Sequence, residues 1–92
     1  MSVEVRLPTL LRPAAEGRAL VEVEGATVGE ALENLVDAHP GLAGQVLTED
    51  GSLHRFVNVY LDDDDVRYLD GLETKIGPGS VLSILPAVAG GA

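Results

Sequence analysis

One amphipathic segment, residues 27–39, lies between stretches in which apolar and polar residues alternate, and this segment most constrains the fold. Thr27 and Glu30 have the spacing of a capping box, in which each side chain bonds a backbone amide at the start of a helix. Pro40 and Gly41 follow and end the helix. Behind the cap, apolar residues recur at helical spacing and form a stripe that must be buried against another element. The stripe consists of Val28, Ala31, Leu32, Leu35 and Val36.

Alternation of apolar and polar residues predicts two strands before this helix and three after it. The first two strands form a hairpin whose long connection contains Pro8 and Pro13, because proline cannot donate to a strand ladder. The last strand is closed by Pro86. The predicted strands, in chain order, are residues 3–7, 19–24, 54–61, 66–68 and 81–85.

Two hairpins around one crossover helix predict an α+β fold, a mixed sheet of about five strands with the helix on one face. This arrangement fits the β-grasp, the ubiquitin-like roll, although element order alone does not separate it from other small α+β folds. We predict one ubiquitin-like β-grasp domain over residues 1–86. Residues 87–92 are small and have little to bury, so they are predicted to form a flexible C-terminal tail.

The composition excludes several classes of function. The 92 residues suffice for one domain, which buries roughly 60–65% of the surface of its unfolded chain. The absence of cysteine excludes disulfides, thiolate catalysis and cysteine-ligated metals. Fifteen acidic against six basic side chains, a net charge of −9, disfavour nucleic acid as a partner. Because no apolar run reaches about 18 residues and no secretory signal is recognisable, we expect no membrane contact and a cytoplasmic location.

No pattern of a catalytic or metal site is present. His39 and His54 lack a second ligand at motif spacing, and no serine lies in a nucleophile-elbow sequence. The glycine-rich turn at residues 77–80 precedes a strand, so it does not place a phosphate at a helix N-terminus. Four aspartates at residues 62–65 break the EF-hand spacing and favour a solvated hairpin turn, with weak cation binding as the alternative. We predict no catalytic residue, no metal site and no cofactor bound by this chain.

Strand alternation also predicts an exposed apolar patch. The polar residues Asn58 and Ser83 mark the outward faces of the third and last strands. Their apolar neighbours of the same parity should share the side of the sheet away from the helix, where such patches tend to bind partners. The alternative is that long loops fold over this patch. The predicted partner interface consists of Phe56, Tyr60, Val81 and Leu85.

The tail ends near a glycine pair, Gly90 and Gly91. Glycine has no Cβ to clash where a backbone passes through a narrow channel. A glycine carboxylate on a thin stalk can therefore be threaded into the active site of another protein, and Ala89 and Gly90 would form the threaded stalk. The plainer interpretation is a disordered end without function.

Three stretches together resemble the MoaD/ThiS-type family of ubiquitin-like sulfur carriers, and more specifically its CysO branch, which serves cysteine biosynthesis. They are LPTLLRP near the start, LHRFVNVYLDDDDVR in the middle and SVLSILPAVAGG at the end. The resemblance runs from Val3 to Gly91. It implies that the chain is no enzyme but a protein co-substrate of partner enzymes, and a monomer when free.

The resemblance also implies a reaction sequence. A ubiquitin-activating-enzyme-like adenylyltransferase would use ATP to adenylate Gly91, and a sulfurtransferase or sulfide would convert the adenylate to a thiocarboxylate. A pyridoxal-phosphate cysteine synthase would take the sulfur onto activated serine. A zinc metallopeptidase would then release cysteine. ATP, pyridoxal phosphate and zinc belong to these partners.

One residue departs from the family pattern, because Ala92 follows Gly91. Ala92 is either a natural extension that a metallopeptidase removes or a remnant of cloning, and a single alanine favours the first. Within the family, a small subunit of molybdopterin synthase or a thiazole-pathway carrier is the alternative function. Outside it, the alternatives are a ubiquitin-like modifier attached to lysines and a plain binding module.

Overall fold

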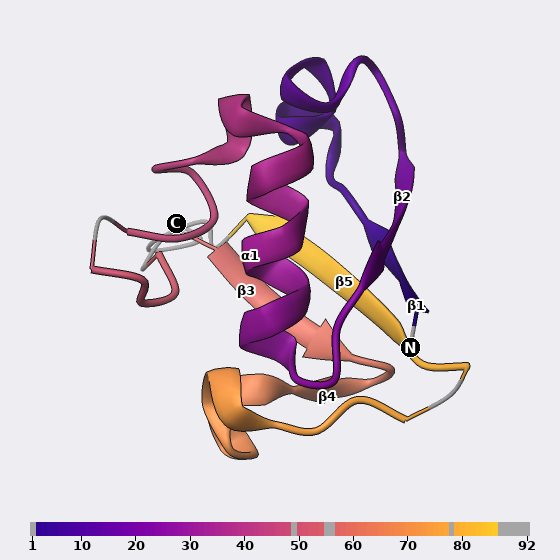
Figure 1. The fold of residues 1–92 in the computed structure, drawn as a ribbon, viewed down its shortest axis with the longest axis vertical. Helices are drawn as coiled ribbons and strands as arrows, with labels where there is room; N and C mark the ends of the chain where they lie inside the picture. Colours follow the sequence, from indigo (N-terminus) through magenta and orange to yellow (C-terminus); the bar gives the residue numbers. More distant parts are fainter. Residues whose placement is uncertain (1, 49, 55–56, 78, 87–92) are drawn as a thin grey trace, which may run out of the picture.

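The strands form one mixed sheet with the order β2-β1-β5-β3-β4 (Figure 1). The computed structural model describes residues 2–48, 50–54, 57–77 and 79–86. At one side of the sheet, β1 and β2 pair as an antiparallel hairpin, and β5 lies parallel to β1. On its other side β5 pairs antiparallel with β3, and β4 covers the end of β3. The strands are β1 (Ser2–Arg6), β2 (Leu20–Glu24), β3 (Val57–Leu61), β4 (Asp64–Asp65) and β5 (Val81–Pro86).

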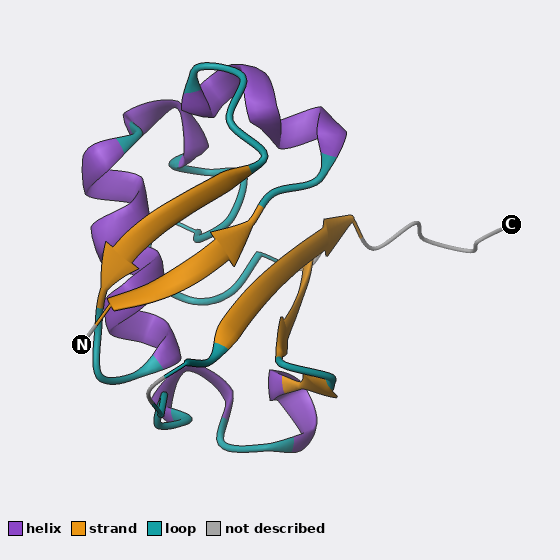
Figure 2. Ribbon diagram, turned by 90° about the vertical axis from the view of Figure 1, so that its right-hand side faces the viewer, coloured by secondary structure: helices purple, strands orange, loops and turns teal. Residues whose placement is uncertain are grey.

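One α-helix, α1 (Val28–Ala38), crosses one face of the sheet in front of β5 and β3 (Figure 1). Figure 2 shows no described helix across the opposite face. Four 3₁₀ helices lie around the sheet, two at its upper end and two beside β4 (Figures 1 and 2). They are η1 (Thr9–Ala15), η2 (Pro40–Leu42), η3 (Val66–Tyr68) and η4 (Gly71–Glu73). A mixed five-stranded sheet with one main helix confirms the predicted α+β, β-grasp fold.

The capping box at the start of α1 forms as a reciprocal pair. The amide of Glu30 donates to Oγ1 of Thr27 at 3.2 Å, and the amide of Ala26 donates to Oε1 of Glu30 at 2.9 Å. The glutamate thus reaches one residue before the cap rather than the cap itself. Both bonds satisfy amides that have no partner within the helix, which is why α1 begins at Val28.

The core lies between α1 and the sheet. Of the predicted helical stripe, Val28, Ala31, Leu32 and Leu35 are buried, and Val36 is half-buried. The strands bury alternate residues toward the helix, as their sequence pattern predicted. Full burial of a leucine or valine side chain contributes about 1.5–3 kcal/mol, so this shared interface holds the helix on the sheet. The strand residues of the core are Val3, Val5, Val21, Val23, Val57, Val59, Leu82 and Ile84.

The predicted strands at residues 3–7, 19–24 and 81–85 each shift by one residue at one or both ends, and the two predicted strands that precede the last one differ more. The described part of the third strand begins at Val57, opposite Pro86 of β5, and His54 does not belong to the strand as predicted. The amide of His54 instead donates to the carbonyl of Val46 at 2.9 Å.

The predicted returning strand at residues 66–68 is the 3₁₀ helix η3, and the strand pairing falls on β4, inside the predicted aspartate turn. Oδ1 of Asp65 accepts the amide of Arg67 at 2.9 Å and caps η3. Val66 is fully buried while Arg67 and Tyr68 are exposed, so three residues that alternate like a strand form one helical turn.

Candidate functional site

β5 ends at Pro86, and the predicted C-terminal tail, residues 87–92, follows it in the sequence. Val57, Asn58 and Val59 of β3 pair with Pro86, Leu85 and Ile84 of β5, and we call these six residues the exit ladder. On the other side of β5, β1 pairs only with residues 81–83. Within the described part of the chain, the last three residues of β5 therefore have a strand neighbour on one side only. The predicted carrier residue Gly91, the stalk residues Ala89 and Gly90, and the extension Ala92 lie outside the described residues.

The predicted interface residues of β3 and β5 lie on the outer face, the side of the sheet opposite α1. Their neighbours Val57, Val59, Leu82 and Ile84 are buried toward α1, and strand residues alternate between faces. Leu85 is 46% exposed. Tyr60 and Val81 are half-buried. Phe56 lies outside the described residues, so its place in the interface stays a prediction.

Polar residues divide the apolar part of the outer face. Asn58 lies opposite Leu85, Ser83 lies opposite Tyr60, and Glu4 lies beside Val81. The exposed apolar surface near the exit ladder is therefore centred on Leu85 rather than spread over a continuous patch. A patch of this kind fits a partner that contributes one apolar side chain together with hydrogen-bonding groups.

Leu20 is a further outer-face residue that the sequence prediction missed. It is 49% exposed and pairs with Arg6, two strands away from β5. Its signal was present in the sequence, because Leu20 has the same parity as the outward glutamates Glu22 and Glu24.

An apolar groove of about 390 Å³ lies beside the exit ladder. This groove was not predicted, because η1 lies in the stretch that was expected to be a loop between the first two strands. Leu10, on η1, is 76% exposed at this groove. The residues that line it are Pro8, Leu10, Leu11, Gly44, Gln45, His54 and Val57.

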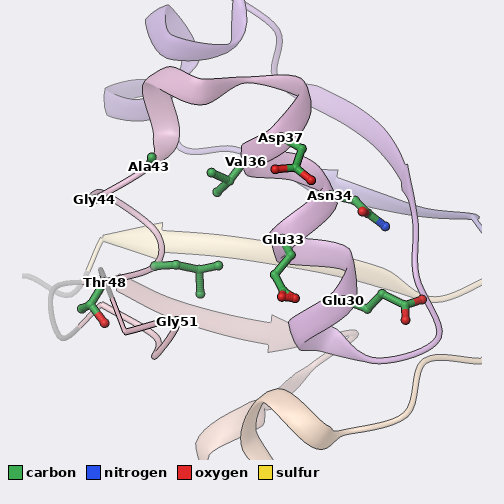
Figure 3. A pocket seen from close by; sticks show the side chains of 10 residues that line it. Glu30, Glu33, Asn34, Val36, Asp37, Ala43, Gly44, Thr48 and Gly51 are labelled. Carbon is green, nitrogen blue, oxygen red and sulfur yellow. The ribbon is translucent and has the colours of Figure 1, made fainter.

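A second groove, of about 440 Å³, lies between α1 and the loop at residues 43–51 (Figure 3). Val36 and Asp37 point from α1 toward the loop, and Glu33 extends below them (Figure 3). Leu47 adds apolar surface. Among the described residues that line this groove there is no histidine, cysteine or lysine, and the hydroxyl of its Thr48 donates to Asp50 rather than to one of the lining carboxylates.

In the loop beside this groove, Asp50 accepts hydrogen bonds from the hydroxyl of Thr48 and, at 3.2 Å, from the amide of Ser52. These bonds, that of Thr48 foremost, lower the pKa of the Asp50 carboxyl below its ordinary value. Because the folded pKa is the lower one, the stabilisation is present above the ordinary aspartate pKa. It is lost as the pH falls through the lowered value.

Aspartates in the turn after β3 accept hydrogen bonds from backbone amides of the protein itself. At Asp62 the backbone turns through a left-handed conformation, with φ of 58°. The amide of Asp62 donates to the carbonyl of Val81 at 2.8 Å, and its Oδ1 accepts the amide of Val81 at 3.1 Å. With Asp65 capping η3, two of the four carboxylates are engaged in the turn. No group of three or more metal-ligating side chains occurs among the described residues.

A sequence model of the ThiS family matches residues 5–91, nearly the whole chain. This match decides the family. The chain belongs to the ThiS family of ubiquitin-like sulfur carriers.

Three relatives show how far the likeness of this ThiS-family chain extends. It is 43% identical over 93 residues to the sulfur carrier protein CysO of Mycobacterium tuberculosis, covering 99% of this chain and 100% of that protein. The crystal structure of the Amycolatopsis orientalis BexX/CysO complex contains a chain that superposes with a TM-score of 0.86 at 44% identity, over 94% of this chain and 96% of that one. The small archaeal modifier protein 1 of Haloferax volcanii superposes with a TM-score of 0.81 at 33% identity, over 95% and 98% of the two chains.

These likenesses confirm the β-grasp fold and the predicted family. The relatives are carriers and modifiers, which agrees with the prediction that this ThiS-family chain is a protein co-substrate and not an enzyme. Among the described residues, no helix is both long enough and apolar enough to span a membrane.

Proposed function

We propose that this chain carries sulfur as a thiocarboxylate on Gly91 and supplies it to cysteine biosynthesis. The observation that carries the proposal is its 43% identity, over essentially its full length, to the sulfur carrier CysO. The exit ladder supports it, because Gly91 is the fifth residue after Pro86 and an extended stalk of five residues reaches at most about 17 Å from the sheet. That reach is enough to enter the active site of a partner.

The proposed chemistry has two activation steps. A carboxylate oxygen of Gly91 attacks the α-phosphorus of ATP, and pyrophosphate leaves, so that an acyl adenylate forms. A sulfide nucleophile then attacks the acyl carbon and displaces AMP, which leaves the thiocarboxylate. The chain contains no cysteine, so the carried sulfur is held on the Gly91 carbonyl carbon and not on a side chain.

In the later steps the thiocarboxylate sulfur adds to the aminoacrylate that a pyridoxal-phosphate cysteine synthase forms from activated serine. This addition forms a thioester between Gly91 and the sulfur of the new cysteine. The amino group of that cysteine then attacks the thioester carbonyl, and the acyl group moves from sulfur to nitrogen. Hydrolysis of the resulting amide by a zinc metallopeptidase frees cysteine and restores the Gly91 carboxylate. The same class of peptidase is proposed to remove Ala92.

The experiment follows the intact mass of the chain ending at Gly91, incubated with adenylyltransferase, ATP and a sulfur source. An increase of about 16 Da, the exchange of oxygen for sulfur, supports the proposal. Adding the cysteine synthase and activated serine then tests the pathway, because the carrier should gain a cysteinyl group. An unchanged mass would contradict the carrier function and favour a plain binding module.

A second candidate function is protein modification, favoured by the likeness to the small archaeal modifier protein 1. In that case the activated Gly91 would form amide bonds to lysines of other proteins. Conjugates of higher mass in the same incubation, with lysine-containing proteins present, would support this function over the sulfur carrier.

We expect Leu85→Asp to weaken activation, because a carboxylate replaces the most exposed apolar side chain among the described residues of the predicted interface. Truncation or charging of an anchor side chain in an interface costs about 2 kcal/mol or more, and the KM for the carrier should therefore rise by at least roughly tenfold. The matched control is Leu20→Asp, a residue of similar exposure on the same face but two strands from β5. Equal KM values for the two variants would remove Leu85 from the interface.

A further inference from the structure

The side chain of Arg67, which follows the aspartate turn, contacts the first residues of β3. Its Nη2 donates to the carbonyl of Val57 at 2.8 Å and to that of His54 at 3.4 Å. Its Nη1 donates to Oδ1 of Asn58. The amide of Arg67 is held in turn by Oδ1 of Asp65 at 2.9 Å, so the residue is anchored at both ends.

These acceptors are uncharged, although Arg67 lies next to a run of aspartates in an acidic chain. The guanidinium therefore serves as a fork of hydrogen-bond donors here rather than as a counter-charge. Hydrogen bonds from a charged donor contribute more than those between neutral groups. Lysine cannot reproduce the fork, because its ammonium acts as a single point charge.

The location of these contacts connects Arg67 to the tail. On the far edge of β3, β4 pairs with Tyr60 and Leu61, and no other strand of the described part of the chain pairs with residues 57–59 there. On the far edge of β5, β1 pairs only with residues 81–83. Among the described residues the exit ladder is therefore only two strands wide, and the backbone groups at its edges depend on contacts other than strand pairing. Arg67 bonds the outer edge of this ladder at Val57, the residue paired with Pro86.

We propose that Arg67 is a positioning residue that fixes where, and in which direction, the tail leaves the sheet. It acts through Val57 and the exit ladder, and it touches neither the nucleotide nor the Gly91 carboxylate. The role rests on the proposed function, since a defined exit matters only for a tail that must be threaded. A misplacement of about 1 Å at a reacting group can reduce the rate by 100-fold.

The test compares Arg67→Ala and Arg67→Lys with the wild type in adenylation by the partner enzyme, measured as ATP–pyrophosphate exchange with the chain ending at Gly91. The matched control is Arg18→Ala, which removes the same charge from an exposed position. For Arg67→Ala we expect kcat to fall by about 10- to 100-fold while KM changes less than twofold. Arg67→Lys should have a kcat between that of Arg67→Ala and that of the wild type. If Arg67→Ala does not fold, Arg67→Lys provides the test in its place.

Hydrogen exchange of the backbone amides provides a second readout that needs no partner. Arg67→Ala should raise exchange in residues 57–59 and 84–85 at least tenfold, and leave β1 and β2 unchanged. If Arg67→Ala only lowers the stability of the whole domain, exchange should instead rise in every strand. In that case kcat, once corrected for the fraction of folded protein, should equal that of the wild type. That result, or a kcat equal to that of Arg18→Ala, would overturn the proposal. If the wild type is not activated at all, the proposed function fails, and the exchange pattern still decides whether Arg67 holds the exit ladder.

Discussion

A chain that retains Ala92 is expected to resist activation, whereas the chain that ends at Gly91 is expected to be adenylated. The carboxyl carbon of Gly91 is bound in a peptide bond as long as Ala92 follows it. One additional residue moves the free carboxylate by up to about 3.3–3.6 Å along an extended stalk. Because a displacement of about 1 Å already costs roughly 100-fold, we expect the rate of adenylation to fall by more than 100-fold.

ATP–pyrophosphate exchange on the two forms of the chain measures this effect directly. Gly91→Ala in the form that ends at residue 91 is the matched control, because it keeps the length of the stalk and adds one Cβ. A further incubation of the Ala92 form with the zinc metallopeptidase should remove alanine and restore activation. A thiocarboxylate found on protein that still carries Ala92 would refute the need for processing.

Gly25→Ala is expected to destabilise the domain by about 2–3 kcal/mol, near the upper end of the usual cost of overpacking. Gly25 joins β2 to α1, and a Cβ placed on it would lie 2.7 Å from the amide nitrogen and 2.8 Å from the Cα of Ala31. Both atoms belong to the helix backbone, which a rotamer change cannot move. The first turn of α1 would have to shift away from β2, and with it the side chains that α1 buries.

Thermal unfolding followed by circular dichroism tests this expectation, since a loss of 2–3 kcal/mol lowers the Tm of a domain this small by roughly 10–20 °C. Gly77→Ala is the matched control, because the nearest atom to its added Cβ is Oγ of Ser80 at 3.9 Å. We expect Gly77→Ala to stay within about 0.5 kcal/mol of the wild type. Equal Tm values for the two variants would show that the connection into α1 accommodates a side chain.

The helix and the faces of the strands were predictable because their signals are local. The spacing of Thr27 and Glu30 and the apolar stripe behind them predict a helix, and α1 is found at Val28–Ala38. Strand alternation has a period of two, so burial of Val59 and Ile84 by itself directs Tyr60 and Leu85 to the other face. The family resemblance rested on stretches along the whole chain, and it is confirmed by the match to residues 5–91.

Other features could not be read from any local pattern. A run such as residues 66–68 is too short for its period to separate a strand from a 3₁₀ turn, and the cap from Asp65 and the burial of Val66 decide it. His54 continues the strand pattern in the sequence, but it lies outside β3 and its amide bonds the carbonyl of Val46.

The sequence by itself thus determined the order of the elements, the helix with its cap, the inward and outward faces of the strands and the glycine pair near the end. The tertiary structure alone decided that β5 lies between β1 and β3, that its last three residues pair with no described strand besides β3, and that Arg67 bonds the outer edge of that pair. The physical reason is the distance along the chain over which each kind of interaction acts. Periodicity and caps act over a few residues, whereas strand neighbours and edge contacts depend on which distant segments share the burial of one core.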